Sequence, residues 1–169
     1  MEIRVLEPAD AASCRDLRLV ALREDPTAFS SSYEEERDIP LSRVAERLAP
    51  TSDNIVLGAF EDGALIAMGG LARERYRKLA HKGVIWGVYV TPMFRKRGVA
   101  RRLLTEMIRQ AESMPGLSQL NLGVNAANPA AIALYESVGF QRFGVERGFM
   151  SVDGVMQDEI HMSRSIAQA

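Results

Sequence analysis

The chain has 169 residues, of which 47% are apolar and 25% are charged, as is ordinary for a globular protein with one well-formed core. Its formal net charge of −1 argues against nucleic-acid binding through bulk electrostatics, so any basic patch must be local. Cys14 is the single cysteine and His81 and His161 are the two histidines, so the sequence predicts neither an intramolecular disulfide nor a metal site.

No segment of the sequence has the character of a targeting signal, a membrane span or a linker. The N-terminal MEIRVLEPAD carries early charges, and no apolar run approaches the roughly 20 residues that cross a bilayer. We therefore expect a cytoplasmic protein without membrane contact. Because repeats and low-complexity tracts are also missing, we expect one domain over residues 1–169.

The N-terminal half reads as a strand, helices and then a hairpin. Residues 2–6 alternate like a short strand, and Asp10 is a candidate N-cap for a helix that ends near residues 24–26. The apolar positions expected on that helix are Leu17, Val20 and Ala21. The elements expected after it are a loop with a short helix (27–40), a helix (41–49), and two strands (54–60 and 64–72) around a turn (61–63).

The C-terminal half begins with a charged connection over residues 73–82 and ends in a second hairpin. The elements expected between and including them are a central strand (83–90), a helix (99–113), a strand (117–124), a helix (128–139) and two strands (140–149 and 156–166) around a turn (152–154). Strand–helix–strand–helix in the middle predicts parallel pairing of 83–90 with 117–124. The hairpins at both ends predict a mixed sheet, an α/β layout that is formally α+β.

The stretch VTPMFRKRGVARRLL, residues 90–104, places bases at the start of a helix, where the helix dipole favours acidic residues. A bound anion would resolve this conflict, because free N–H groups at a helix start donate to phosphate oxygens and Gly98 permits a sharp turn. Arg101 and Arg102 lie one turn further along. The stretch matches neither a P-loop nor GxGxxG. We predict a pyrophosphate site; the alternative is a solvated basic turn.

Two motifs together resemble the GCN5-related N-acetyltransferase (GNAT) family. Residues 95–100, RKRGVA, match that family's pyrophosphate signature Gln/Arg-x-x-Gly-x-Gly/Ala, and NPAAIALYESVGF contains Asn128, Tyr135 and Gly139 at the family's spacing. The order of elements also agrees over nearly the whole chain. The resemblance implies a mostly antiparallel, mixed seven-stranded sheet with a splayed central parallel pair and about four helices on both faces.

The resemblance also implies acetyl-CoA as the donor substrate, with no metal. The backbone of Val88, Tyr89 and Val90 would bind the pantetheine arm, and Asn128 would contact it. Asn128 is also a good N-cap, and it can do both through different groups. The residues implied for the pyrophosphate are Arg95, Lys96, Arg97, Gly98, Val99, Ala100 and Arg101.

Tyr135 is the catalytic candidate. Acyl transfer from CoA expels a thiolate, and a hydroxyl at the sulfur can donate a proton as that charge develops. The alternative is an aromatic core residue on a short helix. The expected general base is missing, because family members that acetylate protein N-termini often carry Glu at the position of Gly123, and strand 83–90 contains no acid.

Acceptor-side candidates come from SSSYEEE, residues 30–36, and from Phe29 before it. Tyr33 and Glu36 could recognise a cationic amine, although an acidic helix start is also favoured by the helix dipole alone. On the last strand, Glu159 and His161 share a face, and His161 could relay protons near neutral pH.

We predict an acetyl-CoA-dependent N-acetyltransferase that acts on a primary amine, preferably of a small molecule, by direct attack in a ternary complex. Cys14 has no histidine near it in sequence, so a covalent intermediate is disfavoured. The alternatives are protein or peptide N-acetylation and a CoA-binding module without catalysis. Nucleic-acid binding is argued against by the charge and by the absence of aromatic residues among the bases. The final hairpin could pair across a homodimer.

Overall fold

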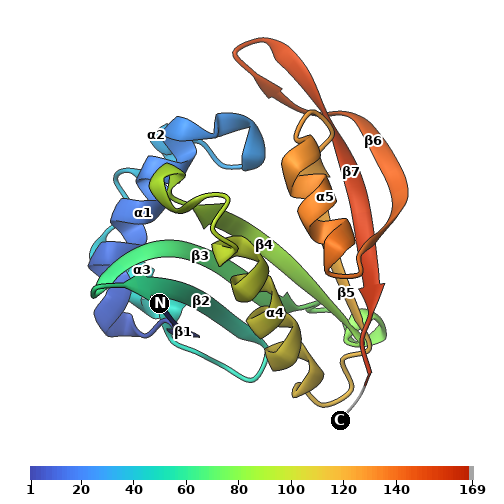
Figure 1. The fold of residues 1–169 in the computed structure, drawn as a ribbon, viewed down its shortest axis with the longest axis horizontal. Coiled ribbons are helices and arrows are strands. Elements are labelled where there is room, and N and C mark those ends of the chain that lie inside the picture. The colour runs from blue at the N-terminus through green and yellow to red at the C-terminus, as the bar shows by residue number, and fades with distance from the viewer. Residues whose placement is uncertain (168–169) are drawn as a thin grey trace.

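A seven-stranded mixed sheet forms the centre of the molecule, and helices cover both of its faces (Figure 1). The computed structural model describes residues 1–167. The strands are β1 (Glu2–Val5), β2 (Asn54–Glu61), β3 (Ala64–Arg73), β4 (Lys82–Val90), β5 (Gln119–Asn125), β6 (Gln141–Val152) and β7 (Val155–Ser165). The helices are α1 (Ala11–Glu24), α2 (Tyr33–Glu36), α3 (Leu41–Leu48), α4 (Val99–Glu112) and α5 (Pro129–Ser137). The expected fold class is confirmed, and α2 is the short helix expected within residues 27–40.

Four 3₁₀ turns join these elements: η1 (Pro8–Asp10), η2 (Pro26–Ala28), η3 (Arg77–Leu79) and η4 (Pro92–Phe94). Among residues 1–167, no helix is both long enough and apolar enough to span a bilayer.

The strand order is β1-β2-β3-β4-β5-β7-β6, and every neighbouring pair is antiparallel except β4 and β5. These two parallel strands pair only at their beginnings, through Lys82–Gln119, Gly83–Leu120 and Val84–Asn121. Beyond Val84 and Asn121 they diverge, as Figure 1 shows between the green β4 and the orange β5. The expected splayed central pair is therefore confirmed.

A bulge in β4 accompanies this divergence. Gly70 of β3 pairs with Trp86, whereas Met68 pairs with Tyr89, so β4 contains one extra residue between the two pairs. Gly87 lies in the bulge with φ of +64°, in the left-handed region that glycine tolerates. Because a bulge bends its strand and increases the local twist, it directs the end of β4 away from β5.

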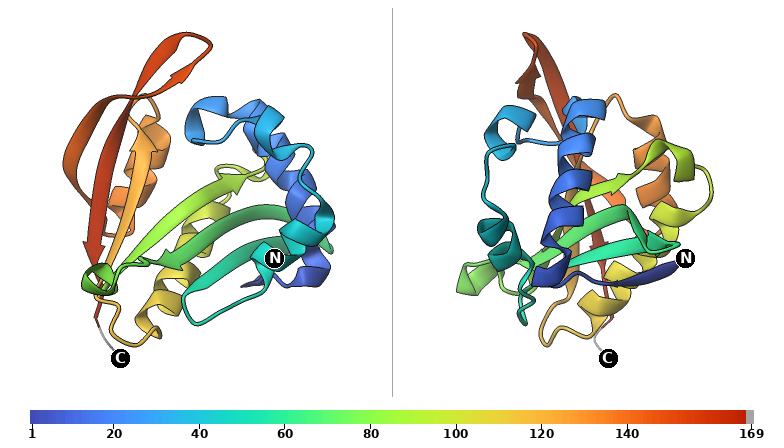
Figure 2. Two further views of the ribbon diagram at one scale, coloured as in Figure 1. Left: turned by 180° about the vertical axis from the view of Figure 1, so that it is seen from behind. Right: turned by 90° about the vertical axis from the view of Figure 1, so that its left-hand side faces the viewer.

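The helices divide between the two faces of the sheet (Figure 2). On one face α4 and α5 pack on the larger core cluster, and α4 buries an apolar stripe there: Leu103, Leu104, Met107, Ile108 and Ala111. On the other face α1 and α3 cover a second cluster that includes Met68 and Tyr89. The predicted stripe of α1 is wrong at Val20, which is 43% exposed because the helix buries Leu17 and Ala21 instead.

The two predicted helix caps have different outcomes. Asn128 caps α5, since its Oδ1 accepts a hydrogen bond from the N–H of Ala131 at 3.0 Å. Asp10 does not cap α1 with its side chain. Its carboxylate instead accepts two hydrogen bonds from Arg4 at 2.7 Å and one from the N–H of Glu7, so it joins β1 to the turn before α1.

Candidate active site

A cavity of about 480 Å³ lies between the end of β4, the start of α4 and one side of α5. It brings together residues from both sequence motifs, with Asp25, Ala28 and Phe29 closing it from the loop after α1. The predicted site residues that line it are Phe29, Val88, Tyr89, Val90, Arg95, Lys96, Gly98, Val99, Ala100, Arg101, Asn128 and Tyr135. Arg97, Tyr33 and Glu36 lie outside this lining.

The last residues of β4 present part of their backbone to the cavity. The N–H of Thr91 donates to the Ile66 carbonyl of β3 at 3.0 Å, so by strand alternation the backbone groups of Tyr89 also face β3. Those of Val88 and Val90 then face the opposite side, where β5 has diverged. The carbonyl of Val90 accepts a hydrogen bond from Nε of Arg95 at 2.9 Å. Val88 therefore presents both of its backbone groups to the cavity side, Val90 presents its N–H while its carbonyl is bound by Arg95, and the backbone of Tyr89 faces β3.

The side chain of Tyr89 points to the other face of the sheet. It is 3% exposed, and its hydroxyl donates a hydrogen bond to Glu24 at the end of α1. Burial, together with the neighbouring Glu24 carboxylate, raises the pKa of this phenol. Tyr89 therefore anchors β4 to α1.

The basic turn forms the charged end of the cavity. Lys96 and Gly98 have φ of +61° and +77°, and α4 begins directly after them. The first N–H groups of a helix have no partners within it, so this end of α4 can donate to an anion. A Cβ placed on Gly98 would meet no atom within 4 Å, which leaves open space in front of the turn.

The arginines of the turn have distinct positions. Arg95 forms an ion pair with Asp25 at 2.6 Å, so its charge is already balanced and it ties the turn to the loop after α1. Arg97 lies over the ring of Phe94 at 5.4 Å. Arg101 lines the cavity, and it donates to the carbonyl of Ser137 at 3.3 Å. Lys96 and Arg101 are therefore the cations best placed to meet an anion in the cavity.

Tyr135 projects from α5 into the same cavity. Its side chain is 8% exposed and makes an edge-to-face contact with Phe140, with ring centroids 6.1 Å apart. Burial raises the pKa of Tyr135 to about 12. The phenol is therefore protonated at neutral pH, as a proton donor must be.

Phe29 joins the cavity to a second hollow of about 570 Å³. This hollow runs between the segment from Ser30 to Glu34 and the β6–β7 turn, where residues 150–153 line its far side. Tyr33 lies in it, with the guanidinium of Arg23 stacked 3.9 Å above its ring. Two of the three predicted acceptor-side residues, Phe29 and Tyr33, thus share one continuous surface.

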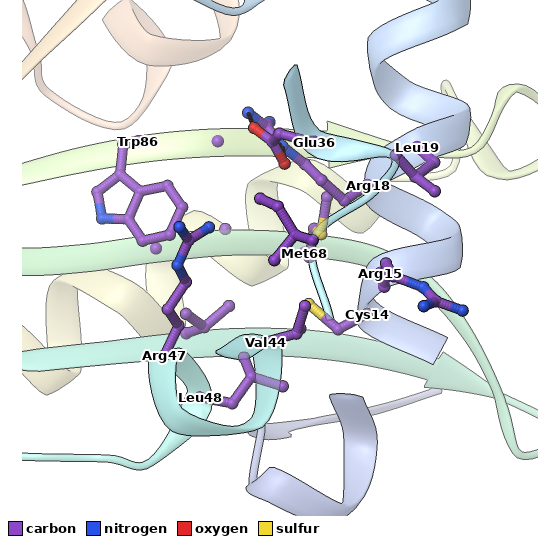
Figure 3. A pocket seen from close by; sticks show the side chains of 15 residues that line it. Cys14, Arg15, Arg18, Leu19, Glu36, Val44, Arg47, Leu48, Met68 and Trp86 are labelled. Atoms are coloured by element: carbon purple, nitrogen blue, oxygen red, sulfur yellow. Dashed lines mark hydrogen bonds and ion pairs between the residues drawn. The ribbon is translucent and has the colours of Figure 1, made fainter. Parts of the chain in front are cut away.

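Glu36 lines a separate pocket of about 130 Å³ between α1, α3 and β3 (Figure 3). Its carboxylate forms an ion pair with Arg18 at 2.9 Å, and Arg47 reaches from α3 toward Trp86 at the other side of the pocket. Cys14 is buried in the same pocket, and burial raises the pKa of its thiol to about 11. A thiol that is protonated at neutral pH is a poor nucleophile.

Asn125 lies outside the lining of the cavity, but it holds neighbouring elements in place and was not predicted from the sequence. Its buried amide donates to the carbonyl of Thr27 and to Oε1 of Gln157, both at 3.0 Å, and its Oδ1 accepts from the N–H of Ala127. It therefore joins β5, β7 and the η2 turn beside Phe29. The sequence could have indicated this residue, because Asn125 lies at the end of a strand and three residues before the capping Asn128.

Comparison with known proteins identifies the family. Residues 19–140 match the model of the Acetyltransferase (GNAT) family. The N-alpha-acetyltransferase RimI of Mycobacterium tuberculosis is 30% identical over 152 residues, which cover 90% of this chain and 85% of that protein. The [Ribosomal protein bS18]-alanine N-acetyltransferase of Salmonella typhimurium is 36% identical over 86 residues, which cover 51% of this chain and 57% of that relative.

Solved structures agree with this assignment. The GNAT-family acetyltransferase of Streptococcus pneumoniae superposes with a TM-score of 0.88 at 25% identity, over 98% of this chain and 99% of that one. The family match covers more than half of the chain and contains both motifs that line the cavity. The chain therefore belongs to the GNAT family and is an N-acetyltransferase.

Proposed function

We propose that the chain transfers the acetyl group of acetyl-CoA to the α-amine of a peptide or protein by direct attack in a ternary complex. One observation carries the proposal: Lys96, Arg101 and the start of α4 line the same cavity as Tyr135. An anion-binding end and a proton donor in one cavity are what a CoA thioester needs.

Each part of the cavity has a role in holding this donor. The open N-terminus of α4, with Lys96 and Arg101, binds the pyrophosphate. The backbone groups of Val88 and the N–H of Val90 pair with the amide groups of the pantetheine arm, as an added strand would. Tyr135 donates a proton to the CoA sulfur as the thiolate leaves.

Direct attack is favoured over a covalent acetyl-enzyme. The one cysteine, Cys14, lies in the separate pocket beneath α1 and has a raised pKa. The acceptor nitrogen therefore attacks the thioester carbon itself, forms the N–C bond and expels the CoA sulfur.

Two observations favour a peptide acceptor over the small amine that the sequence analysis preferred. One of the relatives above is named an N-alpha-acetyltransferase, and the name of the other gives an alanine of a ribosomal protein as its acceptor. The hollow of about 570 Å³ reaches from Phe29 to residues 150–153 of the β6–β7 turn, which leaves room for residues of a peptide beyond its N-terminus. A homodimer through the last hairpin stays a prediction; β6 lies at the edge of the sheet, with Phe143 and Val145 exposed.

An acetyl-transfer assay over an amine panel tests this function. Free CoA thiol is measured with peptides that have unblocked N-termini, the same peptides with acetylated N-termini, amino acids, polyamines and aminoglycosides. We expect turnover with unblocked peptides and none with their blocked counterparts. Turnover with small amines alone would contradict the peptide acceptor. Saturable CoA binding without transfer to any amine would instead support a CoA-binding module without catalysis.

A further inference from the structure

A carboxylate from β7 occupies the space where Gly123 of β5 would carry a side chain. A Cβ built on Gly123 would lie 2.1 Å from Oε1 of Glu159 and 2.4 Å from its Cδ, closer than non-bonded atoms can approach. Gly123 pairs with His161, and Glu159 pairs with Asn125, so Glu159 reaches this space diagonally from the neighbouring strand. Glu159 can therefore adopt this position only because residue 123 is glycine.

The Glu159 carboxylate lies beside β5 where β4 and β5 diverge. It is on the same face of the sheet as α1. Val84 and Asn121 form the last pair between β4 and β5, and Trp86 and Gly123 each follow two residues later on the same face. Glu159 is thus opposite Trp86 and the bulge at Gly87, across the diverging strands. The next residue after the bulge, Val88, already lines the donor cavity. The carboxylate therefore lies on the β5 side of the β4–β5 opening, and it lines neither the donor cavity nor the hollow beside Phe29.

The surroundings of Glu159 are those of a base. Its side chain is 16% exposed, and Nδ1 of His161 lies 3.6 Å from its Oε1. Burial, the largest cause, raises its pKa above the usual value; His161 opposes this shift, and Glu146 on β6 adds to it. A carboxylate with a raised pKa is a stronger base at neutral pH than an ordinary one.

We propose that Glu159 is the proton acceptor for the acceptor amine, and that Gly123 lacks a side chain to make room for it. This inference rests on the proposed acetyl transfer. The acceptor ammonium gives one proton to the Glu159 carboxylate, directly or through one water. The neutral amine then attacks the thioester carbon, the C–S bond breaks, and the sulfur takes the proton of Tyr135. The nitrogen loses its second proton, which restores Tyr135, and Glu159 releases its proton to solvent.

Substitution of Glu159 by Gln tests this role, with Glu146→Gln as the matched control. Glu146 also contacts His161, at 3.3 Å, but its side chain is 55% exposed and lies on β6. We expect Glu159→Gln to lower kcat/KM for a peptide amine by at least about 100-fold, the lower bound for general base catalysis. The Kd of acetyl-CoA should not change, and Glu146→Gln should lower kcat/KM far less than Glu159→Gln, because Glu146 only adds to the pKa shift of Glu159 and takes no proton from the amine.

The pH profile separates a base from a merely structural residue. Without Glu159, the reaction depends on amine that is already neutral in solution, so the remaining rate should rise with pH toward the amine pKa near ~8. The ratio of kcat/KM between wild type and Glu159→Gln should therefore decrease as pH rises. A structural defect would leave the ratio constant.

Stability gives a second control. A carboxyl with a raised folded pKa contributes stability below its unfolded pKa, and this contribution is lost as pH rises through the folded value. Ionised Glu159 therefore costs stability relative to the protonated carboxyl. Glu159→Gln should unfold at the same or a higher temperature than wild type, which excludes misfolding as the cause of lost activity.

Moving the carboxylate between strands is the strongest test. The double substitution Gly123→Glu, Glu159→Gly puts a carboxylate into the same space from β5, and we expect it to recover activity to well above that of Glu159→Gln. Near-wild-type activity of Glu159→Gln would overturn the inference, while the wild type would still acetylate amines. A wild type inactive on every amine would instead contradict the proposed function.

Discussion

Tyr135 and Asn128 both belong to the short helix α5, and both face the donor cavity. Asn128 holds the start of the helix by its cap, and Tyr135 lies two turns further along with its phenol buried. The cap at Asn128 therefore helps to fix the helix that carries the Tyr135 hydroxyl. Each residue has a structural contribution and a proposed chemical one, and substitution can separate the two.

Tyr135→Phe removes the proton donor and keeps the ring. We expect kcat to fall by about 10²-fold or more, because proton donation to a leaving group contributes on that order. The Kd of acetyl-CoA, measured by calorimetry, should stay within about twofold, since the packing against Phe140 is retained. Tyr76→Phe, at a position 76% exposed, is the control. Unchanged kcat in Tyr135→Phe would remove the phenol from the mechanism.

Asn128→Asp and Asn128→Ala separate capping from donor binding. Asp can still accept the hydrogen bond from the N–H of Ala131, whereas Ala cannot, so Ala should cost about 1 kcal/mol of unfolding free energy and Asp much less. If the amide also contacts the pantetheine arm, both variants should bind acetyl-CoA more weakly. If Asn128→Asp binds acetyl-CoA as tightly as wild type does, the role of Asn128 is confined to capping α5.

At the scale of elements, turns and helix caps could be predicted from the sequence, whereas contacts between different strands could not. The turn before α4 and the cap of α5 were predicted because glycine, proline, asparagine and the clustered bases act within a few residues of one another. The bulge at Gly87 and the ion pair between Arg95 and Asp25 depend on the partner element. The position of Glu159 over Gly123 depends on β7 lying between β5 and β6, which no local pattern reveals.

The start of α4 is the element expected to bind the pyrophosphate. The structure directs the test to Lys96 and Arg101, because Arg95 is already paired and Arg97 lies outside the lining. Lys96→Glu with Arg101→Glu should weaken acetyl-CoA binding by at least about 100-fold, since each charge-assisted hydrogen bond contributes roughly 1.5–3 kcal/mol. Arg102→Glu, on the same turn but outside the lining, is the control. Equal Kd values for both variants would refute the assignment.

At the scale of the whole molecule, the sheet is two antiparallel groups of strands joined by the three residue pairs between β4 and β5. The shared cluster beneath α4 and α5 holds the groups together on one face. On the other face, Asn125 connects β5 to the η2 turn. These connections therefore hold the two groups together and fix how far β4 and β5 diverge.

Ion pairs at the outer edge make stability depend on acidity. The hydrogen bond from Arg4 is the main reason that the pKa of Asp10 lies below its usual value of 3.8. A lowered folded pKa contributes stability above the unfolded value, which is lost as pH falls through the folded one. Thermal unfolding should therefore show Asp10→Asn less stable than wild type near neutral pH, with the difference vanishing in acid. Asp16→Asn, at a side chain that is 71% exposed, is the control.

The most direct test of the donor site is a crystal structure of the chain with acetyl-CoA. We predict the pyrophosphate at the start of α4 against Lys96 and Arg101, and the pantetheine arm along Val88 and Val90. The thioester should lie between the Tyr135 hydroxyl and the opening that Glu159 faces. Acetyl-CoA bound elsewhere, with the β4–β5 opening empty, would contradict this account.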